Sequence, residues 1–472
     1  MTARQRRDRV VRIEAPPPPG PGNRANASLH AKVFLGGLFV ITAIGTLLLA
    51  SPWFTASGTP TPLVDAFFTA VSAASVSGLS VVDTLEHWNF AGQLVVLVLV
   101  QTGGLGFMVG AGILLQMLRR GVGAYTLRDE LLLKDGAPTL SVNEALSLAR
   151  NIFRFMVLAE AIGAVCLTAW FLFVARLPLL ESLWQGLFYA VTAFCNAGFD
   201  LSRVAAHTDP ATDPALNLIL IVLMQLGAIS FLVCADVWRK RAWRPLTLDS
   251  KIVLALNGAL LLAGTMVFLA TEWGSALAEL DPGSKLLVSL FQSVSARSAG
   301  FNSIDWSAVN PLTLFFWLGL MLVGGASGST SGGVRLSTVG VVLAAVASTL
   351  RGNTETQLWG RRIAAPIIFR AVTIIVIFLL VYGVGAAGLA VAEHHLASRE
   401  TPMIDLMFEA MSALATVGLS TGITPGLSAF SKLMLCALMF VGHLGPLVTV
   451  YALQKRQRPQ RYRFPEEAVR IG

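Results

Sequence analysis

Phe68-Thr-Ala-Val-Ser-Ala-Ala-Ser-Val-Ser-Gly78-Leu is a short apolar stretch, rich in serine, that ends at a glycine. The pattern recurs three times, as Tyr189-Ala-Val-Thr-Ala-Phe-Cys-Asn-Ala-Gly198-Phe, Phe291-Gln-Ser-Val-Ser-Ala-Arg-Ser-Ala-Gly300-Phe and Phe408-Glu-Ala-Met-Ser-Ala-Leu-Ala-Thr-Val-Gly418-Leu. The four glycines are separated by 120, 102 and 118 residues, which indicates a repeat of about a hundred residues. We therefore expect one structural unit to occur four times in the chain.

Long apolar runs flank each of these short stretches. They cover about residues 33–51, 153–175, 252–271 and 366–392 before the glycines, and about 90–118, 215–238, 311–349 and 428–453 after them. About 20 apolar residues cross a bilayer as a helix, whereas about 10 to 14 are too few. Each unit is therefore predicted to contain a membrane helix, a short pore helix with its loop, and a second membrane helix, which gives eight spanning helices.

The composition agrees with this pattern. Of the 472 residues, 54% are hydrophobic and only 13% are charged, and the mean hydropathy is +0.68. Soluble domains carry about 25% charged residues. The composition excludes a soluble enzyme, a disordered protein and a secreted disulfide scaffold. We predict an all-α integral membrane protein with four repeated units around one central pore.

The short segments predict where an ion would pass. Re-entrant backbone at membrane depth persists only where it is buried in protein or lines a water-filled path, so four such loops are best satisfied on one axis. The C-terminal end of a short helix favours a cation, and a glycine lets consecutive carbonyls face the axis, as in K⁺ filters. A single loop could equally be a helix-packing motif, but four in register favour a pore. Three acids that follow their glycines closely would attract cations at its mouth: Asp83, Asp200 and Asp305.

Basic residues are concentrated in particular segments. Of the 35 Lys and Arg residues, 28 lie in five stretches, at 1–32, 119–154, 239–251, 351–370 and 455–470. These stretches alternate with the apolar pairs, which is the positive-inside pattern of membrane proteins. We therefore expect a multi-pass protein of the cytoplasmic (inner) membrane with both termini in the cytoplasm. The net charge of +8 is explained by topology, and no nucleic-acid partner is expected.

These patterns divide the chain into seven segments. Residues 1–30 are predicted to be a disordered, basic and Pro-rich cytoplasmic arm, and 455–472 a basic cytoplasmic tail. Between them we expect pore repeat 1 at 31–120, a cytoplasmic linker at 121–151, pore repeat 2 at 152–240, pore repeat 3 at 241–350 and pore repeat 4 at 351–454.

At four places the residues resemble the Trk/Ktr/HKT superfamily of potassium transporters, and most closely its Ktr-type membrane (pore) subunit. The motifs are Val76-Ser-Gly-Leu79, Cys195-Asn-Ala-Gly-Phe-Asp200, Ser298-Ala-Gly-Phe-Asn302 and Thr416-Val-Gly-Leu-Ser-Thr-Gly422, and the resemblance covers about residues 33–453. It implies K⁺ as the transported ion, because all four filter positions are Gly, whereas a Ser at the first accompanies sodium preference in the plant branch. The implied filter residues are Val76, Ser77, Gly78, Asn196, Ala197, Gly198, Ser298, Ala299, Gly300, Thr416, Val417 and Gly418.

The resemblance also implies partners and a mode of regulation. Ktr-type subunits are homodimers in which each protomer has its own pore, and they rest on a cytosolic ring of nucleotide-binding regulatory subunits. Membrane lipids are the other expected partner. Some relatives depend on sodium, so Na⁺ as a coupling or activating ion, with symport of the two ions, stays open. No residue of this chain decides that question.

A glycine-rich stretch interrupts the last helix of the third repeat. Gly324-Gly-Ala-Ser-Gly-Ser-Thr-Ser-Gly-Gly333 cannot hold a regular helix well, and it resembles the intramembrane gate loop of Ktr-type subunits. The gate residues implied are Gly324, Gly325, Gly328, Ser329, Thr330, Gly332, Gly333 and His443. The alternative is a glycine-rich packing seam between helices. Relatives usually have Arg where His443 stands, and because His titrates near neutral pH, we expect pH-sensitive gating or leak.

Other ionisable residues within the apolar runs are candidates for a functional role, because an isolated charge in lipid is costly. Arg297 is expected to pin the third loop, while Glu160 and Asp236 are expected near helix ends, in polar surroundings. Two other functions are alternatives to K⁺ uptake. A sodium or non-selective monovalent cation transporter is the first alternative, and an ion-coupled solute transporter is the second, although it predicts inverted repeats. A membrane enzyme is disfavoured because the spans contain no Ser–His pair and no ligand-spaced His, Asp and Glu cluster.

Overall fold

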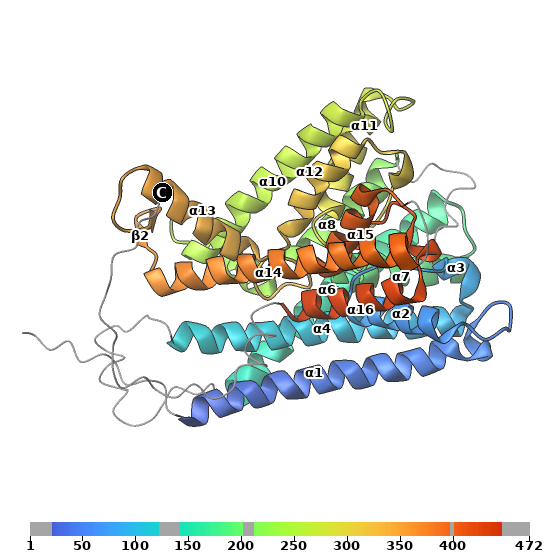
Figure 1. Ribbon diagram of the computed structural model, residues 1–472, viewed down its shortest axis with the longest axis horizontal. Coiled ribbons are helices and arrows are strands. Elements are labelled where there is room, and N and C mark those ends of the chain that lie inside the picture. Colours follow the sequence, from blue (N-terminus) through green and yellow to red (C-terminus); the bar gives the residue numbers. More distant parts are fainter. Residues whose placement is uncertain (1–20, 122–141, 202–211, 397–400, 446–472) are drawn as a thin grey trace, which may run out of the picture.

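The computed structural model describes residues 21–121, 142–201, 212–396 and 401–445, and this part of the chain is predominantly helical (Figure 1). The helices follow one another four times as a long helix, a short helix and a further helix or helix pair. The first two passes are α1 (Pro21–Ala50), α2 (Leu63–Ala74), the one-turn α3 (Thr84–His87) and α4 (Phe90–Gly121), then α6 (Val142–Phe173), α7 (Leu179–Cys195), α8 (Pro214–Ile229) and α9 (Phe231–Lys240).

The third and fourth passes contain a break and small elements. They are α10 (Leu248–Glu272), α11 (Pro282–Ser295), α12 (Pro311–Leu322) and α13 (Leu336–Leu350), then α14 (Ala365–Val391), α15 (Met403–Leu414) and α16 (Ala429–Leu444). Strands β1 (Gln357–Leu358) and β2 (Arg361–Arg362) form an antiparallel hairpin between α13 and α14. Short 3₁₀ turns η1 (Pro52–Phe54), η4 (Trp306–Ala308) and η6 (Thr424–Gly426) and the π-helical turn η5 (Ala392–Leu396) complete the described chain.

Three described helices are long and apolar enough to cross a membrane, and the bent pair α8–α9 would make a fourth. The three cover Leu146–Phe173, Leu248–Glu272 and Ala365–His394. Shorter apolar helices occur at Gly36–Ala50, Phe90–Gly106, Pro311–Leu322, Leu336–Leu350 and Ala429–Leu444. The predicted helical membrane fold is therefore confirmed at this level, whereas the count of eight spans stays a prediction.

Proline sets the start of every short helix. Pro62, Pro178 and Pro402 directly precede α2, α7 and α15, and Pro282 is the first residue of α11. Proline has no backbone N–H and a fixed φ, so it fits the beginning of a helix and resists continuing one. α1 likewise begins at Pro21, so it includes residues 21–30 of the segment predicted as an arm, and residues 1–20 lie outside the described chain.

The four passes are joined into a ring by contacts between neighbours. α4 packs on α7, α8 on α11, α12 on α15, and α16 on α2, so in each pass the first long helix after the short helix lies against the short helix of the next pass. The final contact brings the C-terminal pass back to the N-terminal one, as Figure 1 shows for α16 and α2. A pair of buried aromatic-rich clusters fills the space around the short helices, with Phe188 in one and Phe408 in the other.

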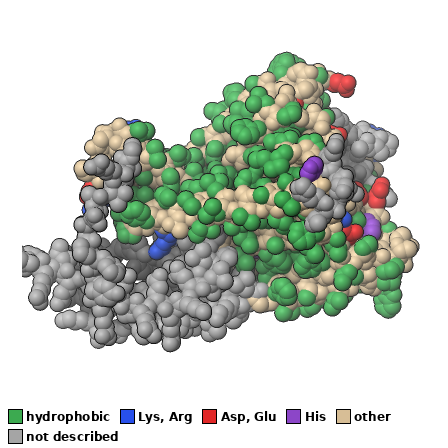
Figure 2. All heavy atoms as spheres, viewed as in Figure 1, with side chains coloured by type: hydrophobic (Ala, Val, Ile, Leu, Met, Phe, Trp, Pro, Cys, Tyr) green, Lys and Arg blue, Asp and Glu red, His purple; other side chains and the backbone are tan. Residues whose placement is uncertain are grey.

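The outer surface is apolar along the helices and charged towards the ends. Large hydrophobic side chains of α14, such as Phe369 and Val384, are exposed, as expected of a helix that faces lipid. Figure 2 shows hydrophobic side chains over the body of the molecule and acidic side chains at the end where Figure 1 places α3. The arginines of β2 lie at the opposite end (Figure 1).

Candidate ion pathway

The four repeat glycines meet in a closed cycle. A Cβ atom on Gly78 would lie 2.4 Å from the carbonyl oxygen of Ala197, and one on Gly198 would lie 2.9 Å from that of Ala299. The cycle continues in the other half of the chain: the corresponding distance from Gly300 to the Val417 oxygen is 2.4 Å, and that from Gly418 to the Ser77 oxygen is 2.4 Å. Each loop therefore touches the next, and the fourth touches the first.

All four loops have the same unusual backbone. The first residue of each filter triplet has a positive φ although it is not glycine: 55° at Val76, 59° at Asn196, 89° at Ser298 and 49° at Thr416. The glycine two residues later also has a positive φ, between 65° and 92°. For β-branched valine and threonine this conformation is strained, and such strain persists only where the surroundings impose it. The twelve predicted filter residues thus form four triplets that share left-handed φ values at their first and third positions.

Hydrogen bonds within each unit support these turns. The amides of Ser77, Ala197 and Val417 donate to the carbonyls of residues five positions earlier, and Ala299 does so four positions earlier. The acceptors belong to the short helices and are Ser72, Thr192, Ser412 and Ser295. Each loop therefore closes directly onto the last turn of its own helix, whose C-terminal end points at the ring.

Three glycines of the helices that follow allow the ends of short helices to pack directly against them. A Cβ on Gly103 would lie 2.1 Å from the Ala74 carbonyl oxygen, one on Gly227 1.9 Å from that of Phe194, and one on Gly442 1.8 Å from that of Leu414. These glycines belong to α4, α8 and α16, and any side chain there would push the short helix away.

The predicted gate stretch is a loop, not a helical packing seam. α12 ends at Leu322 and α13 begins at Leu336, and between them Val323 and Val334 form a parallel bridge that closes the loop at its neck. The loop residues from Val323 to Val334 are buried except for Ser327, which is half-buried. Backbone bonds attach the loop to the kink between α8 and α9: Ala326 N–H donates to Ala228 O at 2.8 Å and Thr330 N–H to Gly227 O at 3.2 Å.

Side chains connect this loop to three of the four ring loops. Asn196 Nδ2 donates to Thr330 Oγ1 at 2.9 Å. Ser298 Oγ accepts from Gly332 N–H at 3.0 Å and donates to Thr416 O at 3.0 Å. A Cβ on Gly332 would lie 2.1 Å from Thr416 Oγ1. The loop therefore lies in direct contact with the ring.

Two arginines and a histidine surround the loop. Arg297 is buried and donates to the Asn257 side chain and to Gly324 O at 3.2 Å, so it ties the third ring loop to the neck of the glycine-rich loop. Arg335 donates to Ser331 O within the loop. His443 is buried, hydrogen-bonds to the Ser75 backbone and lies close enough to Arg335 for their charges to interact.

Glu160 is placed differently from the prediction. The sequence suggested a position near a helix end, but α6 begins at Val142, so Glu160 lies in the interior of that helix. Its carboxylate is buried and accepts a hydrogen bond from Gln101 Nε2 at 2.8 Å. The polar Gln101 within an apolar run was the sequence signal for this partner. The error arose because the polar first turns of α6 precede the apolar run.

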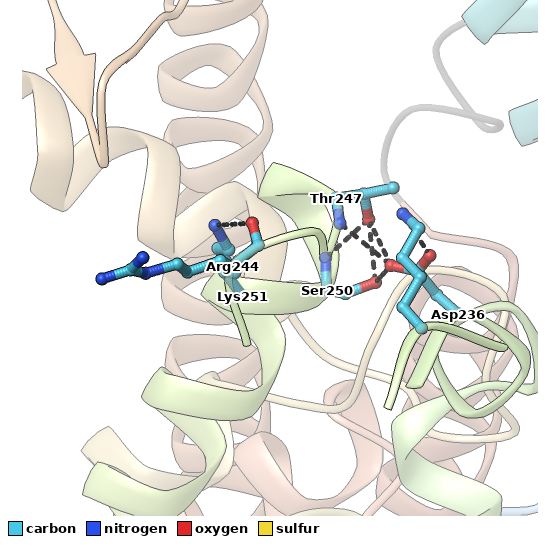
Figure 3. A network of polar contacts seen from close by, with 6 residues as sticks. Asp236, Arg244, Thr247, Ser250 and Lys251 are labelled. Atoms are coloured by element: carbon cyan, nitrogen blue, oxygen red, sulfur yellow. Dashed lines mark hydrogen bonds and ion pairs between the residues drawn. The ribbon is translucent and has the colours of Figure 1, made fainter. Parts of the chain in front are cut away.

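Asp236 and the basic loop after it form the network in Figure 3. Its carboxylate pairs with Lys240 at 2.6 Å and accepts from Thr247 N–H at 2.9 Å and Ser250 Oγ at 2.8 Å. Lys251 Nζ donates to Arg244 O at 3.0 Å. Asp236 does lie near a helix end, and it fixes the connection between α9 and α10.

The three predicted mouth acids make local hydrogen bonds. Asp83 caps α3 by accepting from Leu85 N–H at 2.8 Å, and Asp305 caps η4 by accepting from Ser307. The bonds from Ser307 hold the pKa of Asp305 below its usual value. Asp200 accepts from the Tyr189 hydroxyl.

The basic tail at 455–472 and most of the linker at 121–151 lie outside the described residues.

Comparison with known proteins assigns the chain to a family. The family described as TrkH, cation transport protein, matches residues 38–460. The "Potassium/sodium uptake protein NtpJ" of Enterococcus hirae is 33% identical over 93% of this chain and 97% of its own length. Proteins called "Ktr system potassium uptake protein B" are 34% identical in Bacillus subtilis (92% of this chain, 95% of that protein) and 35% identical in Vibrio alginolyticus (96% and 97%).

A solved structure shares the fold. The crystal structure of the potassium transporter TrkH from Vibrio parahaemolyticus matches with a TM-score of 0.69 over 89% of this chain and 84% of that chain, at 18% identity. At this identity the likeness concerns the fold alone. The family match and the relatives together cover nearly the whole chain. This chain therefore belongs to the TrkH family of cation transport proteins.

Proposed function

We propose that this protein takes up K⁺ across the cytoplasmic membrane through a selectivity filter made of the four glycine loops. The observation that carries the proposal is the closed cycle of contacts among Gly78, Gly198, Gly300 and Gly418. Carbonyl oxygens arranged around one axis can replace the hydration shell of K⁺. The helix ends behind the loops add partial negative charge where a cation would sit. The names of the relatives, which include potassium uptake proteins, support the same ion.

The proposed membrane arrangement has eight spans in four units. The three long helices and the bent pair α8–α9 account for four of them. α1, α4 and α16 supply three more, and α12 with α13 forms the eighth, which is broken by the glycine-rich loop. The short helices α2, α7, α11 and α15 are then re-entrant, and the basic segments face the cytoplasm.

In this arrangement the loop 324–333, together with His443, is the gate. Within this loop Thr330 accepts a hydrogen bond from Asn196 and Gly332 N–H donates to Ser298, and the chain continues from the loop through α13 to the basic β2 hairpin. An ion that leaves the filter towards the cytoplasm would meet this loop, so the loop must move for ions to pass.

The pH sensitivity expected from His443 stays a prediction. Arg keeps its charge at all physiological pH values, whereas His is the side chain that changes charge near neutrality. Burial beside Arg335 favours the neutral imidazole, so the test is whether the flux of the wild-type protein changes between about pH 6 and 8 while that of His443→Arg stays constant. Identical pH profiles for the two proteins would contradict a titrating gate.

A transporter that accepts Na⁺ as well as K⁺ is the second candidate. The printed name of the Enterococcus hirae relative, which includes both ions, favours it. In this case Na⁺ would be a transported, coupling or activating ion. The ring itself does not separate the two candidates, because both need four converging loops.

The proposed partners follow from family membership. A homodimer on a cytosolic nucleotide-binding regulatory ring would use the basic connections for docking, and the exposed Arg241 and Arg361 offer suitable charge. Lipids would cover the exposed apolar side chains of α14. Copurification of the full-length protein with its regulatory subunit tests this part.

Uptake of ⁸⁶Rb⁺ into proteoliposomes tests the proposed function, with K⁺ or Na⁺ as competitor. Inhibition by K⁺ but not by Na⁺ would support a potassium filter. Equal inhibition by both ions would favour the non-selective candidate. Absence of cation flux from correctly inserted protein would overturn both and would return attention to an ion-coupled solute transporter.

A further inference from the structure

One position recurs in all four short helices. In each short helix, one backbone carbonyl accepts a hydrogen bond from the loop that follows, and these carbonyls belong to Ser72, Thr192, Ser295 and Ser412. The recurring position lies three residues before that acceptor. The residues at this position are Thr69, Tyr189, Gln292 and Glu409. We call it the strap position, because at three of the four sites its side chain reaches the chain that leaves the ring.

The straps connect each short helix to residues shortly after its glycine. The Tyr189 hydroxyl donates to Asp200, and Gln292 Nε2 donates to Ser303 Oγ at 2.8 Å. Glu409 accepts from Ser420 Oγ and, at 2.9 Å, from Thr424 Oγ1. In contrast, the Thr69 hydroxyl donates to the Asp65 carbonyl of its own helix at 2.9 Å. The first ring loop is therefore not held by its strap position.

The fourth strap is a fully buried carboxylate. Both oxygens of Glu409 are occupied, since Ser420 bonds to Oε1 and Thr424 to Oε2. The two hydroxyls also lie 2.9 Å from each other, and Gly422 N–H donates to Ser420 Oγ at 2.9 Å. A buried carboxyl group is stable only when hydrogen bonds replace its water, and both oxygens of Glu409 accept such bonds from the chain that leaves the ring. Glu409 thus fixes the whole stretch from Gly418 to Thr424.

The fourth ring loop is also the one that closes the cycle. Gly418 lies against the Ser77 oxygen of the first loop, and Gly300 lies against the Val417 oxygen. A shift of this loop therefore changes the distances to both neighbours. Discrimination between K⁺ and Na⁺ depends on the positions and number of the coordinating carbonyls.

We infer that Glu409 is a positioning residue for ion selectivity, which it sets by holding the outgoing chain of the fourth ring loop through Ser420 and Thr424. This inference rests on the proposed K⁺ filter. Glu409 itself does not touch the ion, because its oxygens face the hydroxyls behind the loop.

The test compares Glu409→Leu with Glu409→Gln in proteoliposomes by the ratio of Na⁺ to K⁺ concentrations that halve ⁸⁶Rb⁺ uptake. Leucine is similar in size but removes both acceptors, so we expect the ratio to fall about tenfold. Glutamine keeps an acceptor for Thr424 and can donate to Ser420, so we expect it to stay within about threefold of wild type. Thr69→Val is the matched control and should leave the ratio unchanged, because Thr69 bonds only within its own helix among the contacts described for it.

Several outcomes would overturn the inference. One is wild-type selectivity in Glu409→Leu with measurable flux, and another is an equal loss in the Gln and Leu variants, which would indicate an effect of charge rather than of position. If Glu409→Leu does not insert, Ser420→Ala with Thr424→Val removes the two donors from the loop side and should lower the ratio in the same way. A failure of the proposed function is distinct from these outcomes, since it would abolish selective uptake by the wild-type protein.

Discussion

The ring loops and the glycine-rich loop beside them contain the same residue type in similar surroundings, but they are held in different ways. Each ring loop is bonded to the last turn of its own helix and wedged against the backbone of the next loop. The loop 324–333 is closed at its neck by the bridge between Val323 and Val334, and hydrogen bonds from Ala326 and Thr330 attach it to the α8–α9 kink of another unit. Close backbone contact leaves a loop little freedom to move, whereas hydrogen bonds to other units can be exchanged for new ones. In the proposed function, the ring is therefore the rigid filter and the loop 324–333 is the movable gate.

Substitution in the ring should have the largest effect, because it disturbs the backbone contacts between neighbouring loops. Gly78→Ser introduces a Cβ 2.4 Å from the Ala197 oxygen at a φ of 82°. We expect the K⁺ to Na⁺ discrimination in ⁸⁶Rb⁺ uptake to fall by about a hundredfold. Gly198→Ser should cost less, because its nearest contact is 2.9 Å.

Gly383→Ser is the control for these variants. Gly383 lies in α14 with open space around its Cβ position, and its selectivity should equal that of the wild type. Unchanged selectivity in Gly78→Ser would contradict the assignment of the ring as the filter.

Weakening the attachment of the loop 324–333 should have a smaller effect, and it should change flux and not selectivity. Thr330→Val preserves shape but removes the bonds to Asn196 and to Phe194 O. Since a buried hydrogen bond is worth about 1 kcal/mol, we expect basal ⁸⁶Rb⁺ flux to rise about fivefold while selectivity stays unchanged. Thr349→Val, at an exposed site that bonds within α13, is the control. A loss of selectivity without a gain in flux would show that the two loops are one mechanical unit.

The smallest expected effect concerns the contact between α16 and α2, where the fourth pass meets the first. Lys432 of α16 pairs with Asp65 of α2 at 2.7 Å, and their side chains are only 11% and 21% exposed. Lys432→Met would leave Asp65 without this partner, so we expect the free energy of unfolding to fall by about 1–2 kcal/mol and Tm in detergent to decrease. Arg362→Gln breaks a pair whose side chains are 68% and 43% exposed and should not change Tm. Equal Tm values for all three proteins would show that this ion pair does not stabilise the contact between α16 and α2.

Repetition made part of this molecule predictable. The four glycine stretches, the helices around them and the break before Val334 all follow from local apolar length and glycine content. The prolines at the starts of the short helices carried a further local signal that went unused. In contrast, the 96° bend at Ser230 lies within a run predicted to be continuous. Ser230 has a φ of 77°, which a serine adopts only under tertiary constraint.

Long-range pairings were not predictable from the sequence. Nothing in the spacing of the chain indicated that Asn196 would bond to Thr330, or that Glu409 would bind two hydroxyls after its own loop. Such pairs depend on how four units rotate about an axis, which local propensity does not determine. The order in which glycines meet carbonyls around the ring has the same origin.

In the proposed function, a monovalent cation binds where the four loops meet. A structure of the protein with Tl⁺ in place of K⁺ tests this directly, because the anomalous signal of Tl⁺ marks its position. We expect a peak on the ring axis, coordinated by backbone oxygens from all four loops, that K⁺ displaces and Gly78→Ser weakens. A protein that transports Tl⁺ but binds it away from the ring, or with oxygens from only one or two loops, would show that the ring is not the filter.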